Sequence, residues 1–178
     1  MNRRSVGAVF FAAAMFLALN ISAMAQTTKT FALHSGDTLM PASASIDPSG
    51  VTTYRGGLVG GQAVGTSTGP FTFSLTFQNT GVIDGEAGVY SGVIVSPFSS
   101  FVVNQQSGRK SVSISGSIDS GTVTYRLTPE GMAEILSVSS NNLTVWEGKN
   151  KTRRIVGTGT LDYGTSIEGS GTMTLNLN

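Results

Sequence analysis

Large apolar side chains alternate with small hydroxyl side chains between residues 71 and 77, where the sequence reads FTFSLTF. Successive side chains of a β-strand point to opposite faces. This period of two therefore predicts a strand that buries Phe71, Phe73, Leu75 and Phe77 and exposes the Ser and Thr residues between them. It is the clearest alternation in the chain and carries the densest aromatic content, so we expect other strands to pack against it.

Two further segments, 111–118 and 171–177, alternate almost as clearly. The residues predicted to face inward are Val112, Ile114 and Ile118 in the first segment and Met173, Leu175 and Leu177 in the second. Shorter apolar segments separated by turn residues bring the total to about ten strands, with turns every ~8–12 residues. This pattern predicts an all-β antiparallel domain, namely a closed barrel of about eight to ten strands, with a β-sandwich as the alternative.

Gly, Pro, Asn, Asp and Ser clusters mark the predicted chain reversals. The predicted turns are 47–50, 79–81, 84–86, 119–121, 128–131, 139–142 and 162–164. The glycine-rich segment 56–70 is predicted to be either a mobile loop or a bulged, strongly bent strand.

The first 25 residues have the organisation of a secretory signal peptide. Arg3 and Arg4 precede an almost unbroken apolar run over 6–19, and Ala23-Met24-Ala25 offers small residues at the two positions that a signal peptidase reads. A transmembrane anchor is the alternative, but the run is short for a span of ~20 residues. We therefore predict cleavage after Ala25, a single domain over 26–178, and a periplasmic or extracellular location.

Charge and cysteine content narrow the classes further. Only 12% of the residues are charged, about half the usual ~25%. Without residues 1–25 the chain has nine Lys and Arg against ten Asp and Glu, so its overall charge gives no reason to expect nucleic-acid binding. The absence of cysteine means that an exported domain must be stabilised by its core and its strand ladders instead of disulfides.

Catalytic and metal-binding patterns are weak. The single histidine, His34, has Ser35 and Asp37 beside it, but three neighbours in one segment rarely converge as a catalytic triad requires. One histidine and no cysteine disfavour a zinc site, and Asp84-Gly85-Glu86 lacks the spacing of a calcium loop. We therefore predict no catalytic residue, metal or cofactor.

A basic cluster follows the only tryptophan. Trp146 precedes Lys149, Lys151, Arg153 and Arg154, and on a hairpin Trp146 and Arg153 could stack as a cation–π pair. One interpretation is a patch for an anion, a glycan or a lipid headgroup. The other is a hairpin tip whose charges keep it soluble and prevent edge-to-edge pairing.

Threonine pairs recur as T-x-T at 122–124, 158–160 and 172–174. They resemble the flat threonine arrays that bind ice. Such arrays need regular stacking, and the intervals of 36 and 14 residues between these segments are uneven. The spacing therefore disfavours an array, and Thr is common in strands for ordinary reasons.

The C-terminal quarter carries a family resemblance. The sequence GTGTL at 157–161 followed by GSGT at 169–172 resembles the G-T-G-x-aromatic … G-x-G segment of the allene-oxide-cyclase and dirigent-like barrels, with Leu161 in place of the aromatic residue. The resemblance implies an eight-stranded antiparallel barrel with a central apolar cavity. It carries over no site residue and does not imply cyclase activity.

These observations favour an exported, non-enzymatic protein that holds a small apolar or amphipathic ligand inside a barrel. The candidate ligand-binding residues are Phe71, Phe73, Phe77, Trp146, Arg153 and Arg154. The hypothesis requires an interior that side chains do not fill completely. A structural or adhesive cell-surface protein and a small outer-membrane barrel are the alternatives, and a cyclase-like enzyme stays open.

Overall fold

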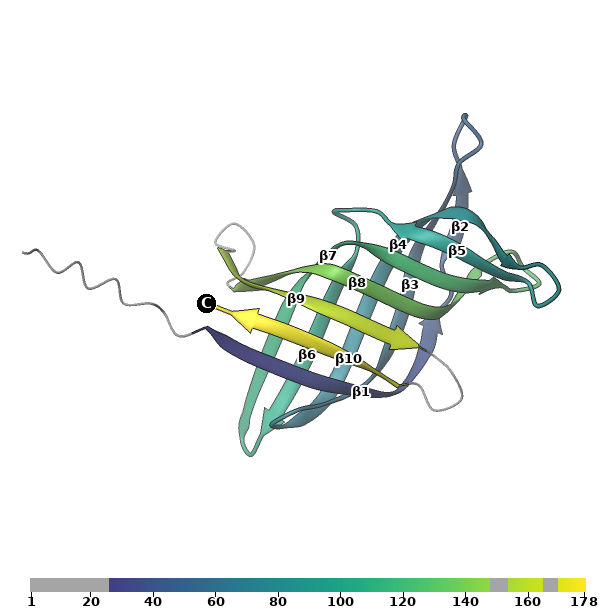
Figure 1. Cartoon of the computed structure of the whole chain (residues 1–178). Helices are drawn as coiled ribbons and strands as arrows, with labels where there is room; N and C mark the ends of the chain where they lie inside the picture. Colours follow the sequence, from purple (N-terminus) through teal and green to yellow (C-terminus); the bar gives the residue numbers. More distant parts are fainter. Residues whose placement is uncertain (1–25, 148–153, 165–169) are drawn as a thin grey trace, which may run out of the picture.

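The computed structural model describes residues 26–147, 154–164 and 170–178, which form ten antiparallel strands (Figure 1). The strands are β1 (Thr27–Met40), β2 (Ser43–Ile46), β3 (Thr52–Val64), β4 (Thr68–Asp84), β5 (Val89–Ile94), β6 (Ser100–Ser107), β7 (Lys110–Leu127), β8 (Ala133–Glu147), β9 (Arg154–Gly164) and β10 (Ser170–Leu177). The all-β, antiparallel prediction is confirmed. The predicted signal peptide lies outside the described residues.

Eight strand positions close a ring of hydrogen bonds. Starting from β3 the order is β1, β10, β9, β8, β7, then β5 and β6, then β4, which pairs again with β3. β5 and β6 share one position, because β5 pairs with one half of β4 and β7 and β6 pairs with the other half. Register shifts interrupt five of the ladders. The ring is therefore too irregular to be described as a regular barrel.

A buried serine fills the break between β5 and β6. The side-chain hydroxyl of Ser99 accepts the backbone N–H of Thr76 at 2.9 Å and donates to the carbonyl of Thr76 at 3.1 Å. Both residues are buried, and these bonds supply the ladder contacts that a continuous strand would have made. The prediction that Thr76 faces water is therefore wrong.

Several predicted turns are bends within long strands. The segments 79–81, 119–121 and 139–142 lie inside β4, β7 and β8, at or beside register shifts. Glycine and small polar residues suit a bulge as well as a turn, so the sequence signal was real and its interpretation was wrong. Segment 56–64 likewise belongs to β3, with a shift between Tyr54 and Gly57, which confirms the bulged-strand alternative over the loop. The turns at 47–50, 84–86 and 128–131 are confirmed.

The core follows the predicted alternation. Phe71, Phe73, Leu75 and Phe77 are no more than 1% exposed. Ile114, Ile118, Met173 and Leu175 are also buried, and Leu177 packs against the core. Val112 is a correction, because 51% of it is exposed. It pairs with Gln105 in the hairpin of β6 and β7, which projects from the end of the sheet (Figure 1), so no opposite strand covers it.

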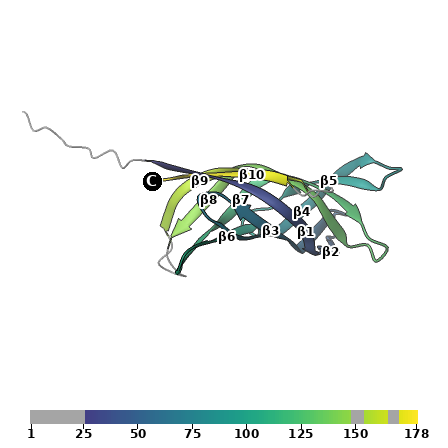
Figure 2. The same ribbon diagram turned by 90° about the horizontal axis from the view of Figure 1, so that it is seen from below.

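The two ends of the ring differ. We call the end that holds Thr27, Glu147, Arg154 and Leu177 the mouth, and the opposite end the closed end. At the closed end the chain just after β1 reaches across to β8: Ala42 and Ala133 exchange two backbone hydrogen bonds of 2.9 and 2.8 Å. Figure 2 shows the sheet folded over on itself, with β9 and β10 on one side and β3 and β6 on the other.

Candidate functional site

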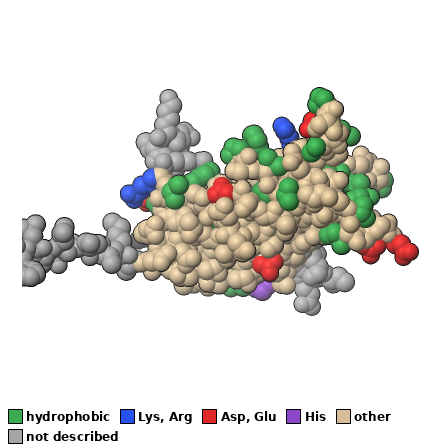
Figure 3. Space-filling view, turned by 45° about the horizontal axis from the view of Figure 1, so that its top comes forward, with side chains coloured by type: hydrophobic (Ala, Val, Ile, Leu, Met, Phe, Trp, Pro, Cys, Tyr) green, Lys and Arg blue, Asp and Glu red, His purple; other side chains and the backbone are tan. Residues whose placement is uncertain are grey.

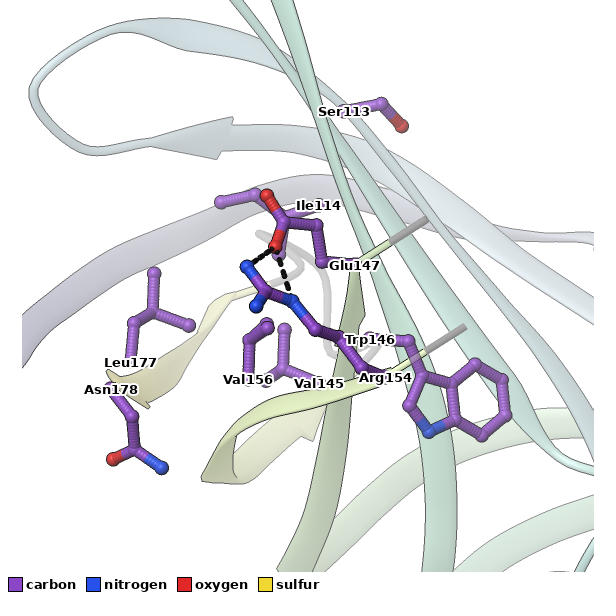
Figure 4. A pocket seen from close by; sticks show the side chains of 9 residues that line it. All are labelled: Ser113, Ile114, Val145, Trp146, Glu147, Arg154, Val156, Leu177 and Asn178. Carbon is purple, nitrogen blue, oxygen red and sulfur yellow. Dashed lines mark hydrogen bonds and ion pairs between the residues drawn. The ribbon is translucent and has the colours of Figure 1, made fainter. Parts of the chain in front are cut away.

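An open pocket of about 300 Å³ lies at the mouth, between β7, β8, β9 and β10 (Figure 4). Its apolar floor consists of Ile114, Val145, Val156 and Leu177, one residue from each strand. Ile114 and Val145 are 7% and 1% exposed, whereas Val156 and Leu177 are partly buried against the core. Here the hydrophobic interior of the ring reaches solvent, as it does in most small-molecule sites.

Strand register directs two charged side chains over this floor. Glu147 pairs with Arg154, and Trp146 pairs with Ile155. On β8, Glu147 shares the inner face with Val145, because side chains two positions apart point the same way. On β9, a register shift opposite Val145 and Trp146 interrupts the alternation, so Arg154 and Val156 line the pocket (Figure 4) although Thr158 and Thr160 face outward. Figure 4 shows the ion pair above the floor and the indole of Trp146 directed away from it.

The ion pair at the rim is exposed. The Nε atom of Arg154 donates to Oε2 of Glu147 at 2.9 Å, and Nη2 of Arg154 donates to the same oxygen. The two side chains are 75% and 60% exposed, and ion pairs of this kind contribute only ~0–1 kcal/mol. The guanidinium can therefore exchange Glu147 for another anion at little cost.

A second cation lies at the same end. Lys29 on β1 pairs with Leu175 of β10 and occupies the same face as Phe31. It lines a smaller pocket of about 190 Å³ with Phe31 and Thr66. Glu147 is the one acidic side chain among the described residues that line the two pockets, so basic side chains outnumber acidic ones at the mouth.

The aromatic residues predicted to bind a ligand lie in the packed core and not at the mouth pocket. The rings of Phe71 and Phe73 lie 4.8 Å apart, and Tyr163 contacts both, at 5.5 and 5.8 Å between centroids. Phe77 packs at 5.3 Å from Tyr54 and 5.0 Å from Tyr125. A ligand among these rings would have to displace them, so the contacts favour a packing role. Their predicted role in ligand binding stays a prediction.

Two core tyrosines differ in their hydrogen bonding. The hydroxyl of Tyr125 donates to Oδ1 of Asn79 at 2.8 Å. The buried hydroxyl of Tyr163 has no hydrogen-bond partner among the described residues and lies against β1, where a Cβ atom on Gly36 would come within 1.7 Å of it. Burial, and to a lesser extent the charge of Asp37, raise the pKa of Tyr163 to about 12. It is therefore protonated at neutral pH and unsuited to act as a base.

Two acidic side chains at turns, Asp47 and Asp84, have structural roles. Oδ1 of Asp47 accepts from the hydroxyl of Ser49 and from the amides of Ser49 and Val51, and these bonds, the hydroxyl first, lower the pKa of Asp47. Oδ1 of Asp84 accepts the amides of Glu86 and Ala87. Across residues 26–147, 154–164 and 170–178, no group of three His, Asp or Glu side chains is placed to hold a metal ion. The same residues include no helix long and apolar enough to cross a membrane.

The structure brings together only part of the predicted basic patch. Trp146 and Arg154 both line the mouth pocket. Lys149, Lys151 and Arg153 lie outside the described residues. The predicted stacking of Arg153 on Trp146 therefore stays a prediction. The register places Ile155 opposite Trp146.

Two of the threonine pairs meet at one position across the ladders. Thr160 on β9, Thr174 on β10 and Thr30 on β1 are direct neighbours across the ladders. The next row contains Thr158, Asn176 and Thr28, and the Thr28 hydroxyl donates to Oδ1 of Asn176 at 2.9 Å. Antiparallel pairing therefore aligns Thr160 with Thr174 without a sequence repeat, whereas Thr172 lies opposite Asp162, so the pairs do not form a complete threonine array. Figure 3 shows a broad face of the molecule with few charged or hydrophobic side chains.

Sequence reasoning missed most of the pocket. Lys29, Val145, Glu147, Val156 and Leu177 were not identified as site residues. A partial signal was available, because alternation places Val145 and Glu147 on one face of β8, whereas the position of Arg154 and Val156 at the pocket depends on the register shift between β8 and β9. The convergence of these residues with β7 and β10 depended on ring closure.

No family model, curated protein or solved structure matches this chain. The resemblance to allene-oxide-cyclase and dirigent-like barrels therefore stays a prediction. The glycines that carry part of it have a local reason: a Cβ atom at Gly157 or Gly159 would lie 2.2 or 2.4 Å from a backbone oxygen of β10. The motif allows β9 and β10 to pack closely whatever the chain's ancestry.

Proposed function

We propose that this chain is an exported, non-enzymatic binding protein whose strands work as a closed barrel that holds a small apolar or amphipathic molecule at its mouth. The observation that carries the proposal is the apolar floor of Ile114, Val145, Val156 and Leu177, open to solvent beneath an exposed ion pair. Export rests on the N-terminal sequence pattern.

The mouth is a better site than the centre of the ring. Around Phe71, Phe73 and Phe77 the aromatic rings contact one another at 4.8–5.8 Å, so binding there would require the core to repack. At the mouth Val156 and Leu177 are only partly buried, so part of the apolar surface is already exposed. The volume of about 300 Å³ is at the lower limit of the ~300–1,000 Å³ typical of ligand pockets, which favours a small ligand.

A matched pair of leucines tests the location. Leu177 lies at the mouth and Leu127 at the closed end, and both are partly buried against the core. With 1-octanol as the probe and methyl NMR shifts as the measurement, Leu177→Gln should weaken binding about tenfold, because it removes apolar surface that the ligand covers. Leu127→Gln should leave binding unchanged, with circular dichroism confirming that both variants fold. Absence of octanol binding to the wild type, or equal effects of both variants, would contradict the proposal.

The aligned threonine rows favour a second candidate, a structural or adhesive protein that attaches to a neutral, hydroxyl-rich surface. The outer faces of β1, β9 and β10 present Thr30, Thr160 and Thr174 side by side. Sedimentation with insoluble polysaccharide tests it. Thr160→Glu should reduce adsorption, and Thr122→Glu, an exposed position on β7, should not. Equal adsorption of both variants would remove this candidate.

The outer-membrane alternative gains no support from these strands. A lipid-facing surface needs an outward apolar band, whereas the outward positions of β1, β9 and β10 carry mainly Thr, with Asp162 and Asn176 among them.

A further inference from the structure

We propose that the occupant of the mouth pocket is a single-chain amphipath with a carboxylate head. Its head binds the guanidinium of Arg154 in place of Glu147, and its chain lies on the apolar floor. This inference rests on the proposed function and adds the chemical class of the ligand.

The floor of the pocket indicates the shape of the ligand's apolar part. Its four side chains come from four adjacent strands in the order β7, β8, β9 and β10. All four are aliphatic, so they offer a surface for an alkyl chain and no aromatic platform on which a sugar or a planar ring could stack. An unbranched chain suits a pocket of about 300 Å³.

The ion pair at the rim indicates the chemistry of the ligand's head group. Arg154 already binds a carboxylate there, through Nε and Nη2 to Oε2 of Glu147. A guanidinium matches a carboxylate geometrically and can bind it through two parallel hydrogen bonds. The pair is 75% and 60% exposed, so Glu147 can return to water when a ligand carboxylate takes its place.

Lys29 provides a second reason for an anionic head. It lies on the inner face of β1 opposite Leu175, across β10 from the strand that carries Arg154. Once Glu147 is displaced, the lining side chains at this end carry two cations and one solvated anion. The extra positive charge at this end of the ring favours an anionic head over a cationic one.

The test compares octanoate with 1-octanol, which have the same chain length but only one of which is charged. Binding to the purified protein is followed by the methyl NMR shifts of Ile114, Val145, Val156 and Leu177. We expect octanoate to bind more tightly than octanol, and Arg154→Gln to weaken octanoate about tenfold, the effect typical of losing a hydrogen bond to a charged group. Octanol affinity should change less than about twofold.

The direction in which Glu147→Gln changes octanoate affinity distinguishes competition for Arg154 from a purely structural ion pair. If Glu147 competes with the ligand for Arg154, its neutralisation should tighten octanoate binding. If the ion pair only stabilises the hairpin, Glu147→Gln and Arg154→Gln should weaken both ligands alike. Arg126→Gln is the matched control, because Arg126 forms an exposed ion pair with Glu134 of the same type, far from the mouth, and should change neither affinity.

The outcomes separate the two proposals. Octanol binding without a preference for octanoate, or parallel effects of Glu147→Gln and Arg154→Gln, would overturn the carboxylate inference and leave the mouth site standing. Failure of both ligands to bind the wild type would overturn the proposed function as well.

Discussion

The two ends of the ring are built from the same alternating strands and are completed in opposite ways. At the closed end Ala42, between β1 and β2, bonds directly to Ala133 at the start of β8, and aromatic residues fill the interior. At the mouth the strands separate, and the inner-face positions end in Glu147 and Arg154 above aliphatic side chains. The difference between the two ends shows how an apolar interior becomes accessible to a ligand. It does so only at the end where strands on opposite sides of the ring do not bond to each other.

The closed end should therefore be the main source of stability. Phe77 is fully buried between Tyr54 and Tyr125, so Phe77→Ala should lower the free energy of unfolding by about 3–5 kcal/mol. Leu177→Ala, at the partly exposed mouth, should cost no more than about 1.5 kcal/mol, because less surface is buried there. Urea denaturation measures both values. Equal losses would show that the two ends contribute alike to stability.

Breaking the hydrogen bonds between β1 and β8 should lower the free energy of unfolding by less than Phe77→Ala does. The hydroxyl of Thr38 donates to the carbonyl of Ile135 at 3.0 Å and accepts its amide at 3.1 Å. Thr38→Val keeps the shape but removes both bonds, which should cost about 2 kcal/mol and speed hydrogen exchange at the Ile135 amide. Thr30→Val, on the outer face, is the control and should change stability by less than about 0.5 kcal/mol. Unchanged exchange at Ile135 would mean that the closed end does not depend on this link.

The smallest predicted effect separates two buried phenols. Tyr163→Phe removes an unpartnered hydroxyl and should stabilise the protein by up to about 1 kcal/mol, whereas Tyr125→Phe loses a bond to Asn79 and should destabilise it by about 1 kcal/mol. Urea denaturation at pH 7 measures both. Destabilisation by Tyr163→Phe would mean that its hydroxyl is satisfied in solution.

The pH dependence of the same variant gives a further check. The pKa of Tyr163 is raised to about 12 in the folded protein, above the ~10 of an unfolded tyrosine. The folded state thus favours the protonated form, so this contribution to stability is complete below pH ~10 and is lost as the pH rises toward 12. Tyr163→Phe should lose less stability than the wild type over that range. Burial also raises the pKa of Tyr125. The Tyr163→Phe variant should therefore still lose part of its stability at high pH.

Local alternation was sufficient to predict much of the fold. The inward faces of 71–77 and 171–177 were identified correctly because a period of two needs no knowledge of the partner strand. Thr76 and Val112 departed from prediction because their exposure depends on what lies opposite: a serine in the gap between β5 and β6 for the first, and solvent beyond a projecting hairpin for the second. The candidate site was predicted only at Trp146 and Arg154.

The sequence by itself determined the all-β class, the alternating core and the absence of disulfides, since each follows from residue type and nearest-neighbour order. Only the tertiary structure decided whether a glycine or asparagine made a turn or a bulge, which threonines became neighbours, and where the interior opens. These features depend on pairing between strands that are distant in the chain, as in Lys29 with Leu175 or Thr38 with Ile135. Register and ring closure are collective properties of such pairs, so no single segment encodes them.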